Sequence, residues 1–187
     1  MDAFGYLSVL LSIIIGLGVT QLLTAFGRVI RHRDRVRVDW LPLLWVVVLL
    51  VVFVQVWWSM FGLRNYNGWT FGSFLIILAQ TSALYLMAAV LLPEQIDAES
   101  IDLAAHYERQ RRWFFSFLVA ALLISLAKDR VMNGRWPSGL NFTFHMIVMA
   151  LALSAIFIRH RRYQEFAGIV GAGIFATYIV VLFPRLQ

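Results

Sequence analysis

The sequence predicts an all-α integral membrane protein with six transmembrane helices, and three observations support this fold class. Hydrophobic residues make up 61% of the 187 residues and charged residues only 14%, against roughly 45–50% and about 25% in soluble domains. The apolar residues form long blocks, as a bilayer span of about 20 helical residues requires. Fifteen of the sixteen cations are arginines, most of them in short segments between these blocks. We therefore expect one polytopic membrane domain over residues 1–187.

Six apolar blocks define the expected spans, and residues typical of helix ends or membrane interfaces bound them. Pro93 and Pro184 follow the third and sixth blocks, where proline ends helices. Trp40 and Trp113 begin two other blocks, as interfacial anchors do. The expected spans are Phe4–Ile30, Trp40–Leu63, Phe71–Leu92, Trp113–Ala127, Leu140–Ile158 and Phe166–Phe183.

The first and fourth blocks depart from the usual span length. At 1.5 Å per residue they would form helices about 40 Å and about 23 Å long. The loop Glu94–Arg112 has its acidic residues early and its arginines late, an order that suits a helix macrodipole. It predicts a short cytoplasmic helix over Ser100–Arg112, before the fourth span or continuous with it. Three spans in each half also admit a 3+3 inverted repeat, in which the first and fourth spans correspond.

The distribution of cations orients the chain in the membrane. The loops after the first span, before the fourth and after the fifth hold eleven of the sixteen cations. The positive-inside rule places these loops in the cytoplasm and both termini outside it. The net charge of +6 therefore indicates that the basic loops contact anionic lipid headgroups, and it does not indicate nucleic-acid binding.

The residues present exclude several kinds of chemistry. The chain has no cysteine, which rules out disulfides, cysteine-ligated metals and thiol catalysis. Apart from Asp129 at a span end, the expected spans hold no carboxylate, although proton-coupled transporters normally keep one inside. A lipid-modifying enzyme would have only Lys128, Asp129 and His145 as acid–base groups. We predict no catalytic residue, no metal and no cofactor.

Small residues recur every four positions in the first span. This spacing aligns small side chains in one helical stripe, so that another helix can approach closely. The stripe predicts helix packing within the chain or across a homodimer, and the alternative is a flexible helix that lines a cavity. Its members are Ser8, Ser12, Gly16, Thr20 and Thr24.

Three glutamines lie inside the expected spans, at Gln21, Gln55 and Gln80. Hydrocarbon cannot satisfy their amides, so the side chains must face protein or water. They form either interhelical hydrogen bonds or a polar pocket at which three consecutive helices converge. Trp58, in the outer half of the second span, is either an interfacial anchor or a stacking wall for a ligand.

Two further groups have distinctive chemistry. Lys128, Asp129 and Arg130 close the fourth span, where they neutralise one another or form a headgroup, anion or proton site on the outer face. His145 is the one histidine within an expected span. It serves either as a hydrogen-bonded helix contact or as a proton sensor.

Three segments carry a resemblance to known proteins: YLSVLLSIIIGLGVTQLLTAFGRVI, QVWWSMFGLR and YERQRRWFF. They resemble a family of small six-helix bacterial inner-membrane proteins, over most of the chain. The resemblance implies a location in the bacterial inner membrane. It implies no activity and no catalytic residue, because none is assigned to the family.

These observations lead to two hypotheses of function. The first is a small transporter or channel-like protein with a polar cavity, to which Gln21, Gln55, Trp58, Gln80 and His145 contribute. The second is a non-catalytic membrane partner, sensor or assembly subunit that docks through its arginine-rich cytoplasmic loops. Membrane lipids and a second copy of the chain are the expected partners.

Overall fold

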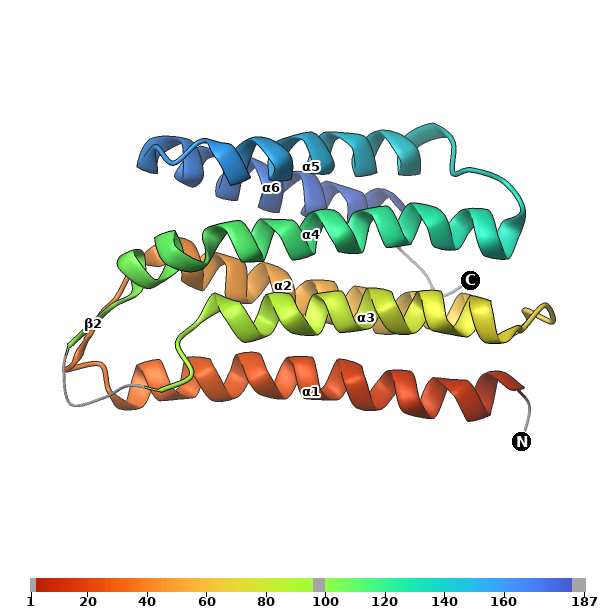
Figure 1. The fold of residues 1–187 in the computed structure, drawn as a ribbon, viewed down its shortest axis with the longest axis horizontal. Helices are drawn as coiled ribbons and strands as arrows, with labels where there is room; N and C mark the ends of the chain where they lie inside the picture. Colours follow the sequence, from red (N-terminus) through yellow and green to blue (C-terminus); the bar gives the residue numbers. More distant parts are fainter. Residues whose placement is uncertain (1–2, 96–99, 183–187) are drawn as a thin grey trace.

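The computed structural model describes residues 3–95 and 100–182, and in this part the chain forms an all-α bundle of six helices (Figure 1). A 3₁₀ turn, η1 (Phe61–Leu63), extends the second helix, and two short strands, β1 (Val36–Arg37) and β2 (Ile101–Asp102), lie in the loops. Phe183 and Pro184, expected at the end of the sixth span, lie outside the described residues. The helices are α1 (Ala3–Arg31), α2 (Trp40–Met60), α3 (Phe71–Leu91), α4 (Leu103–Asn133), α5 (Gly139–Phe157) and α6 (Arg161–Leu182).

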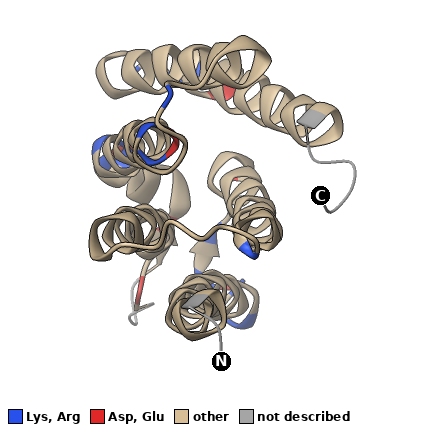
Figure 2. Cartoon of the chain, turned by 90° about the vertical axis from the view of Figure 1, so that its right-hand side faces the viewer, with Lys and Arg blue, Asp and Glu red and all other residues tan. Residues whose placement is uncertain are grey.

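Five helices, α1, α2, α3, α5 and α6, are long and apolar enough to cross a membrane. Charged residues occupy only short stretches of the bundle (Figure 2). Large apolar side chains remain exposed on its surface, and Phe71 and Phe157 are each 77% exposed. A bilayer would cover such side chains, whereas water would not. The chain is therefore a multi-pass membrane protein, as the sequence predicts.

Local sequence explains where three of the helices begin. Asp39 caps α2 by accepting a hydrogen bond from the backbone N–H of Leu41 at 2.9 Å. Thr70 and Ser73 form a reciprocal capping box at the start of α3, in which each backbone N–H donates to the other hydroxyl, at 2.8 and 3.1 Å. Asp102 caps α4 by accepting from two backbone N–H groups. Such caps satisfy donors that the first helical turn leaves without a partner.

Helix α4 differs most from the prediction. The short helix expected over Ser100–Arg112 is not a separate element, because residues 103–112 form the first turns of α4 and Ile101–Asp102 form β2. The alternative of a helix continuous with the fourth span is the observed one. Charges at both ends leave only Trp113–Ala127 uninterrupted, and α4 is not among the five helices identified as apolar enough to cross.

Helix α6 begins earlier than predicted, at Arg161 instead of Phe166. The first turn is polar, so hydropathy alone does not reveal it. Arg161 joins the starts of two helices, because its guanidinium lies 2.8 Å from the Asp39 carboxylate and 2.7 Å from that of Glu165. The prediction that Arg161 belongs to a loop is wrong.

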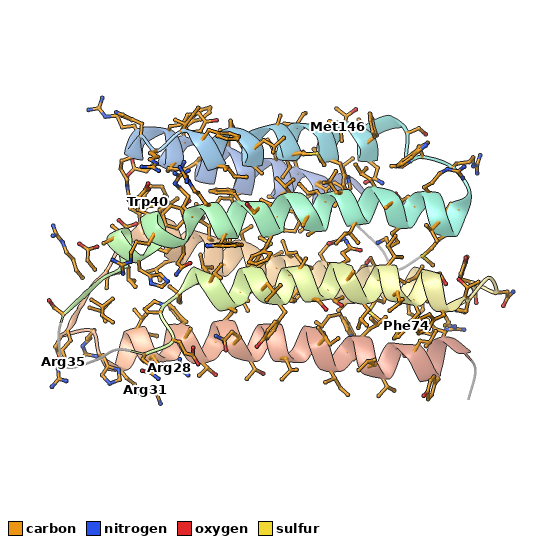
Figure 3. All side chains as sticks on the ribbon, viewed as in Figure 1. Arg28, Arg31, Arg35, Trp40, Phe74 and Met146 are labelled. Carbon is orange, nitrogen blue, oxygen red and sulfur yellow. The ribbon has the colours of Figure 1, made fainter. Side chains whose placement is uncertain are left out.

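The arginine-rich loops are tied together at one end of the bundle. Strands β1 and β2 pair in parallel, with Val36 opposite Ile101. Figure 3 shows Arg28, Arg31 and Arg35 gathered at this end, where Trp40 also lies. The sequence did not predict this pairing, because strands of two residues are too short to show a period.

Helices α2 to α6 form a ring. Each packs against the next along the chain, and α6 closes the ring by packing against α2. Helix α1 lies at the edge of the bundle, outside the ring, and packs against α2 and α3 (Figures 1 and 2). A site inside the ring is therefore built from five helices, and α1 supports it from outside.

Helix α1 buries a face that is different from the small-residue stripe. Its buried positions recur every three or four residues and are Leu11, Ile15, Gly18, Leu22, Ala25 and Val29. Of the stripe, Ser8 is half-buried and the rest are exposed, namely Ser12, Gly16, Thr20 and Thr24. These exposed members lie off the face that α1 buries against the described helices, and packing across a homodimer stays a prediction.

Candidate functional site

A cavity of about 260 Å³ lies inside the α2–α6 ring. Its lining along α2 runs from Trp45 to Ser59, a rise of about 21 Å at 1.5 Å per residue. Because this small volume extends over such a length, the cavity is long and narrow, and we call it the slot. Helix α1 is not among the elements that line it.

The wall of the slot is mostly apolar. Valines of α2 at positions 48, 52 and 56 face leucines of α4 at positions 118 and 122. On α6 the wall includes Gly171, where an added Cβ would lie 3.4 Å from a ring carbon of Trp45. The absence of a side chain at Gly171 therefore keeps the space beside Trp45 open.

The polar end of the slot is a hydrogen-bonded network across α4, α5 and α6. The Nδ1 atom of His145 lies 2.8 Å from the backbone oxygen of Asn141, and its Nε2 atom lies 3.2 Å from the Ser125 hydroxyl. A carbonyl only accepts, so Nδ1 carries a proton and donates to Asn141, while Nε2 pairs with the Ser125 hydroxyl. The Tyr178 hydroxyl donates to the Asn141 side chain at 3.2 Å, and that side chain donates weakly to Asp129 at 3.5 Å. His145 is thus both a helix contact and part of the cavity wall.

Two of the three glutamines line the slot. Gln55 comes from α2 and Gln80 from α3, and neither forms a hydrogen bond with another residue of the described ranges. The third, Gln21, is half-buried on α1 and outside the slot. Trp58 is also half-buried and is not among the lining residues. The structure therefore brings together Gln55, Gln80 and His145, and it separates Gln21 and Trp58 from them.

The charged group at the end of α4 is divided between two environments. A second hollow, of about 330 Å³, lies between the loop after α2 and the end of α4, and it shares Ser59, Lys128 and Asp129 with the slot. These three residues therefore form the mouth of the slot. Arg130 lies outside both hollows, is exposed, and donates to the backbone oxygen of Gly134.

Aromatic rings form the opposite end of the slot. The indole of Trp45 packs against Phe114 and Phe115, with ring centroids 5.2 and 5.6 Å apart. Phe114 and Phe115 are themselves buried. Edge and tilted contacts of this kind fill space with apolar ring atoms, although the indole N–H of Trp45 is a buried polar group among them. The slot thus has one mostly apolar end and one charged mouth.

A buried polar cluster lies beside these rings, at the end of α5. The guanidinium of Arg111 donates to the backbone oxygens of Ala155 and Ile156, the latter at 3.0 Å. The amide of Gln164 donates to the same Ala155 oxygen at 3.0 Å and accepts from the Tyr107 hydroxyl at 3.1 Å. The cluster satisfies carbonyls that the last turn of α5 leaves free.

Arg111 does not lie where the sequence predicts, which is with Arg109 and Arg112 in one basic cytoplasmic segment before the fourth span. Arg111 is only 1% exposed, whereas Arg109 and Arg112 are exposed. The helical spacing of Tyr107, Arg111 and Phe114 is the signal that could have placed Arg111 on a buried face. A test of docking through this loop should therefore change Arg109 and Arg112 and retain Arg111.

The described ranges contain no group of three or more His, Asp or Glu side chains placed to hold a metal ion. No protein-family model, curated protein or solved structure matches the chain. The resemblance to small bacterial inner-membrane proteins therefore stays a prediction.

Proposed function

We propose that this protein is a small transporter or channel-like protein that binds its solute in the slot. One observation carries the proposal: Gln55 and Gln80 line the slot without a hydrogen-bonding partner in the described chain. A polar group left unsatisfied within a membrane costs several kcal/mol. A solute or water inside the slot supplies the missing partners.

We also propose that α4 is a sixth transmembrane helix and that the arginine-rich end is cytoplasmic. Helix α4 belongs to the ring and runs alongside the other helices (Figure 1). The arginine-rich loops lie together at one end of the bundle, which is the distribution that the positive-inside rule associates with the cytoplasm. A bacterial inner membrane is the proposed location, on the resemblance alone.

Leucine at both Gln55 and Gln80 is expected to lower solute flux about tenfold. Each amide would contribute about 0.6–1 kcal/mol of solute binding, and the sum of about 1.2–2 kcal/mol brackets the roughly 1.4 kcal/mol of a tenfold effect. Flux of inorganic ions, small metabolites and single-chain amphiphiles into proteoliposomes measures it. Gln21→Leu is the matched control, because it makes the same chemical change on α1, outside the slot.

Two results would contradict this proposal. One is a wild-type protein whose flux equals that of protein-free vesicles across the panel. The other is a solute whose flux falls equally in the Gln21→Leu variant and in the Gln55→Leu/Gln80→Leu variant, since the slot would then have no special part in transport.

A further inference from the structure

The two ends of the slot differ in a way that selects among solutes. The mouth holds a cation, a carboxylate and a hydrogen-bonding network, while the opposite end holds mostly aromatic and aliphatic side chains, with the buried indole N–H of Trp45 among them. Between them the wall is mostly apolar over about 21 Å of helix rise. A small hydrophilic solute would leave most of this wall without a matching surface.

Lys128 is the distinctive group at the mouth. Within the described residues its ammonium makes no hydrogen bond and no ion pair within 4 Å, although it borders both hollows. The carboxylate of the neighbouring Asp129 accepts a weak hydrogen bond from Asn141 at 3.5 Å and also attracts Lys128 electrostatically. A cation in such partly dry surroundings attracts an anion more strongly than it would in water.

We propose that the slot binds an amphiphile with an anionic head and one long apolar chain, with the head at Lys128 and the chain directed towards Trp45. This inference rests on the proposed function, whose solute class it names. The head would lie at a helix end and the chain would run along the helices, as the head and chain of a membrane lipid do. A fatty acid and an anionic lysophospholipid, such as a lysophosphatidylglycerol, share this chemistry.

Tryptophan fluorescence in nanodiscs tests the inference, with amphiphiles brominated at the chain end as contact quenchers. One variant keeps Trp45 and has phenylalanine at the other six tryptophans; a second keeps only Trp113. Trp45 is 6% exposed and lines the slot, whereas Trp113 is 61% exposed on the same helix as the Phe114 that touches Trp45. Trp113 therefore reports amphiphile dissolved in the bilayer at a similar depth.

The expected result is saturable quenching of Trp45 by a brominated fatty acid or anionic lysophospholipid, at concentrations where quenching of Trp113 still rises linearly. Lys128→Met should raise the half-saturating concentration about tenfold, as loss of a charge-assisted contact does. Lys128→Arg should retain binding. A brominated alkyl trimethylammonium should bind no better to wild type than to Lys128→Met.

The inference is overturned if quenching of Trp45 does not saturate with either anionic probe, or if Lys128→Met leaves the half-saturating concentration unchanged. If the single-tryptophan protein does not fold, the difference between wild type and Trp45→Phe supplies the same signal. Solute flux without saturable quenching would contradict the amphiphile as the ligand but would still support transport. Saturable quenching without flux of any solute, brominated probes included, would contradict transport but would still support the binding site.

Discussion

Replacing Arg111 by methionine should lower the free energy of unfolding by about 3 kcal/mol, because a hydrogen bond from a charged donor contributes about 1.5–3 kcal/mol. The side chain is 1% exposed, and its guanidinium donates to two carbonyls at the end of α5. Methionine fills a similar volume but offers no donor. The Ala155 oxygen would keep only the amide of Gln164, and the Ile156 oxygen would lose its donor.

Unfolding by SDS in mixed micelles measures this loss, and Arg112→Met is the matched control. Arg112 is the next residue and is exposed, so its replacement should change stability by less than about 0.5 kcal/mol. If the two substitutions lower the free energy of unfolding equally, the loss of a positive charge explains the effect, and the buried hydrogen bonds of Arg111 do not.

Alanine at Gly18 should lower stability by about 1–3 kcal/mol, the usual cost of inserting atoms into a packed core. A Cβ there would lie 2.3 Å from Cζ and 2.5 Å from Cε1 of Phe53. Phe53 is fully buried, so its ring has little space into which it can move. The close contact between α1 and α2 depends on the missing side chain at this position.

A double-mutant cycle with Phe53→Leu attributes the effect to this contact. If the ring causes the clash, Gly18→Ala should cost less in the Phe53→Leu background, with a coupling energy of about 1 kcal/mol or more. Gly16→Ala is the control, since an added Cβ there meets no atom within 4 Å. The steric account fails if the Gly16 and Gly18 substitutions have the same effect.

The helix boundaries could be predicted closely because apolar block length and interfacial residues both report on the bilayer. The expected span Phe71–Leu92 and the observed α3, Phe71–Leu91, differ by one residue. The early start of α6 at Arg161 could not be predicted in this way. Its first turn is stabilised by Asp39, which is distant in sequence, and hydropathy does not register such a contact.

The buried face of α1 was harder to predict for a physical reason. In a soluble helix, polar residues mark the exposed side, but a membrane helix is apolar all round and this contrast is weak. The recurrence of small residues predicts close packing at Gly16, whereas α1 and α2 approach closely at Gly18, beside Phe53. For the same reason the sequence does not distinguish Gln21 from Gln55 and Gln80. Gln21 lies outside the slot only because α1 packs outside the ring.

The most direct test of the account is aqueous access to Ser125, which lines the slot and bonds to His145. The chain has no cysteine, so Ser125→Cys and Ser12→Cys each introduce a single thiol, and thiols react as thiolates that form in water. We expect a membrane-impermeant methanethiosulfonate, added on the side of the Lys128 mouth, to modify Ser125→Cys and not Ser12→Cys on the exposed face of α1. If Ser125→Cys is as unreactive as Ser12→Cys, or reacts only from the arginine-rich side, the slot does not open at Lys128 and the account is wrong.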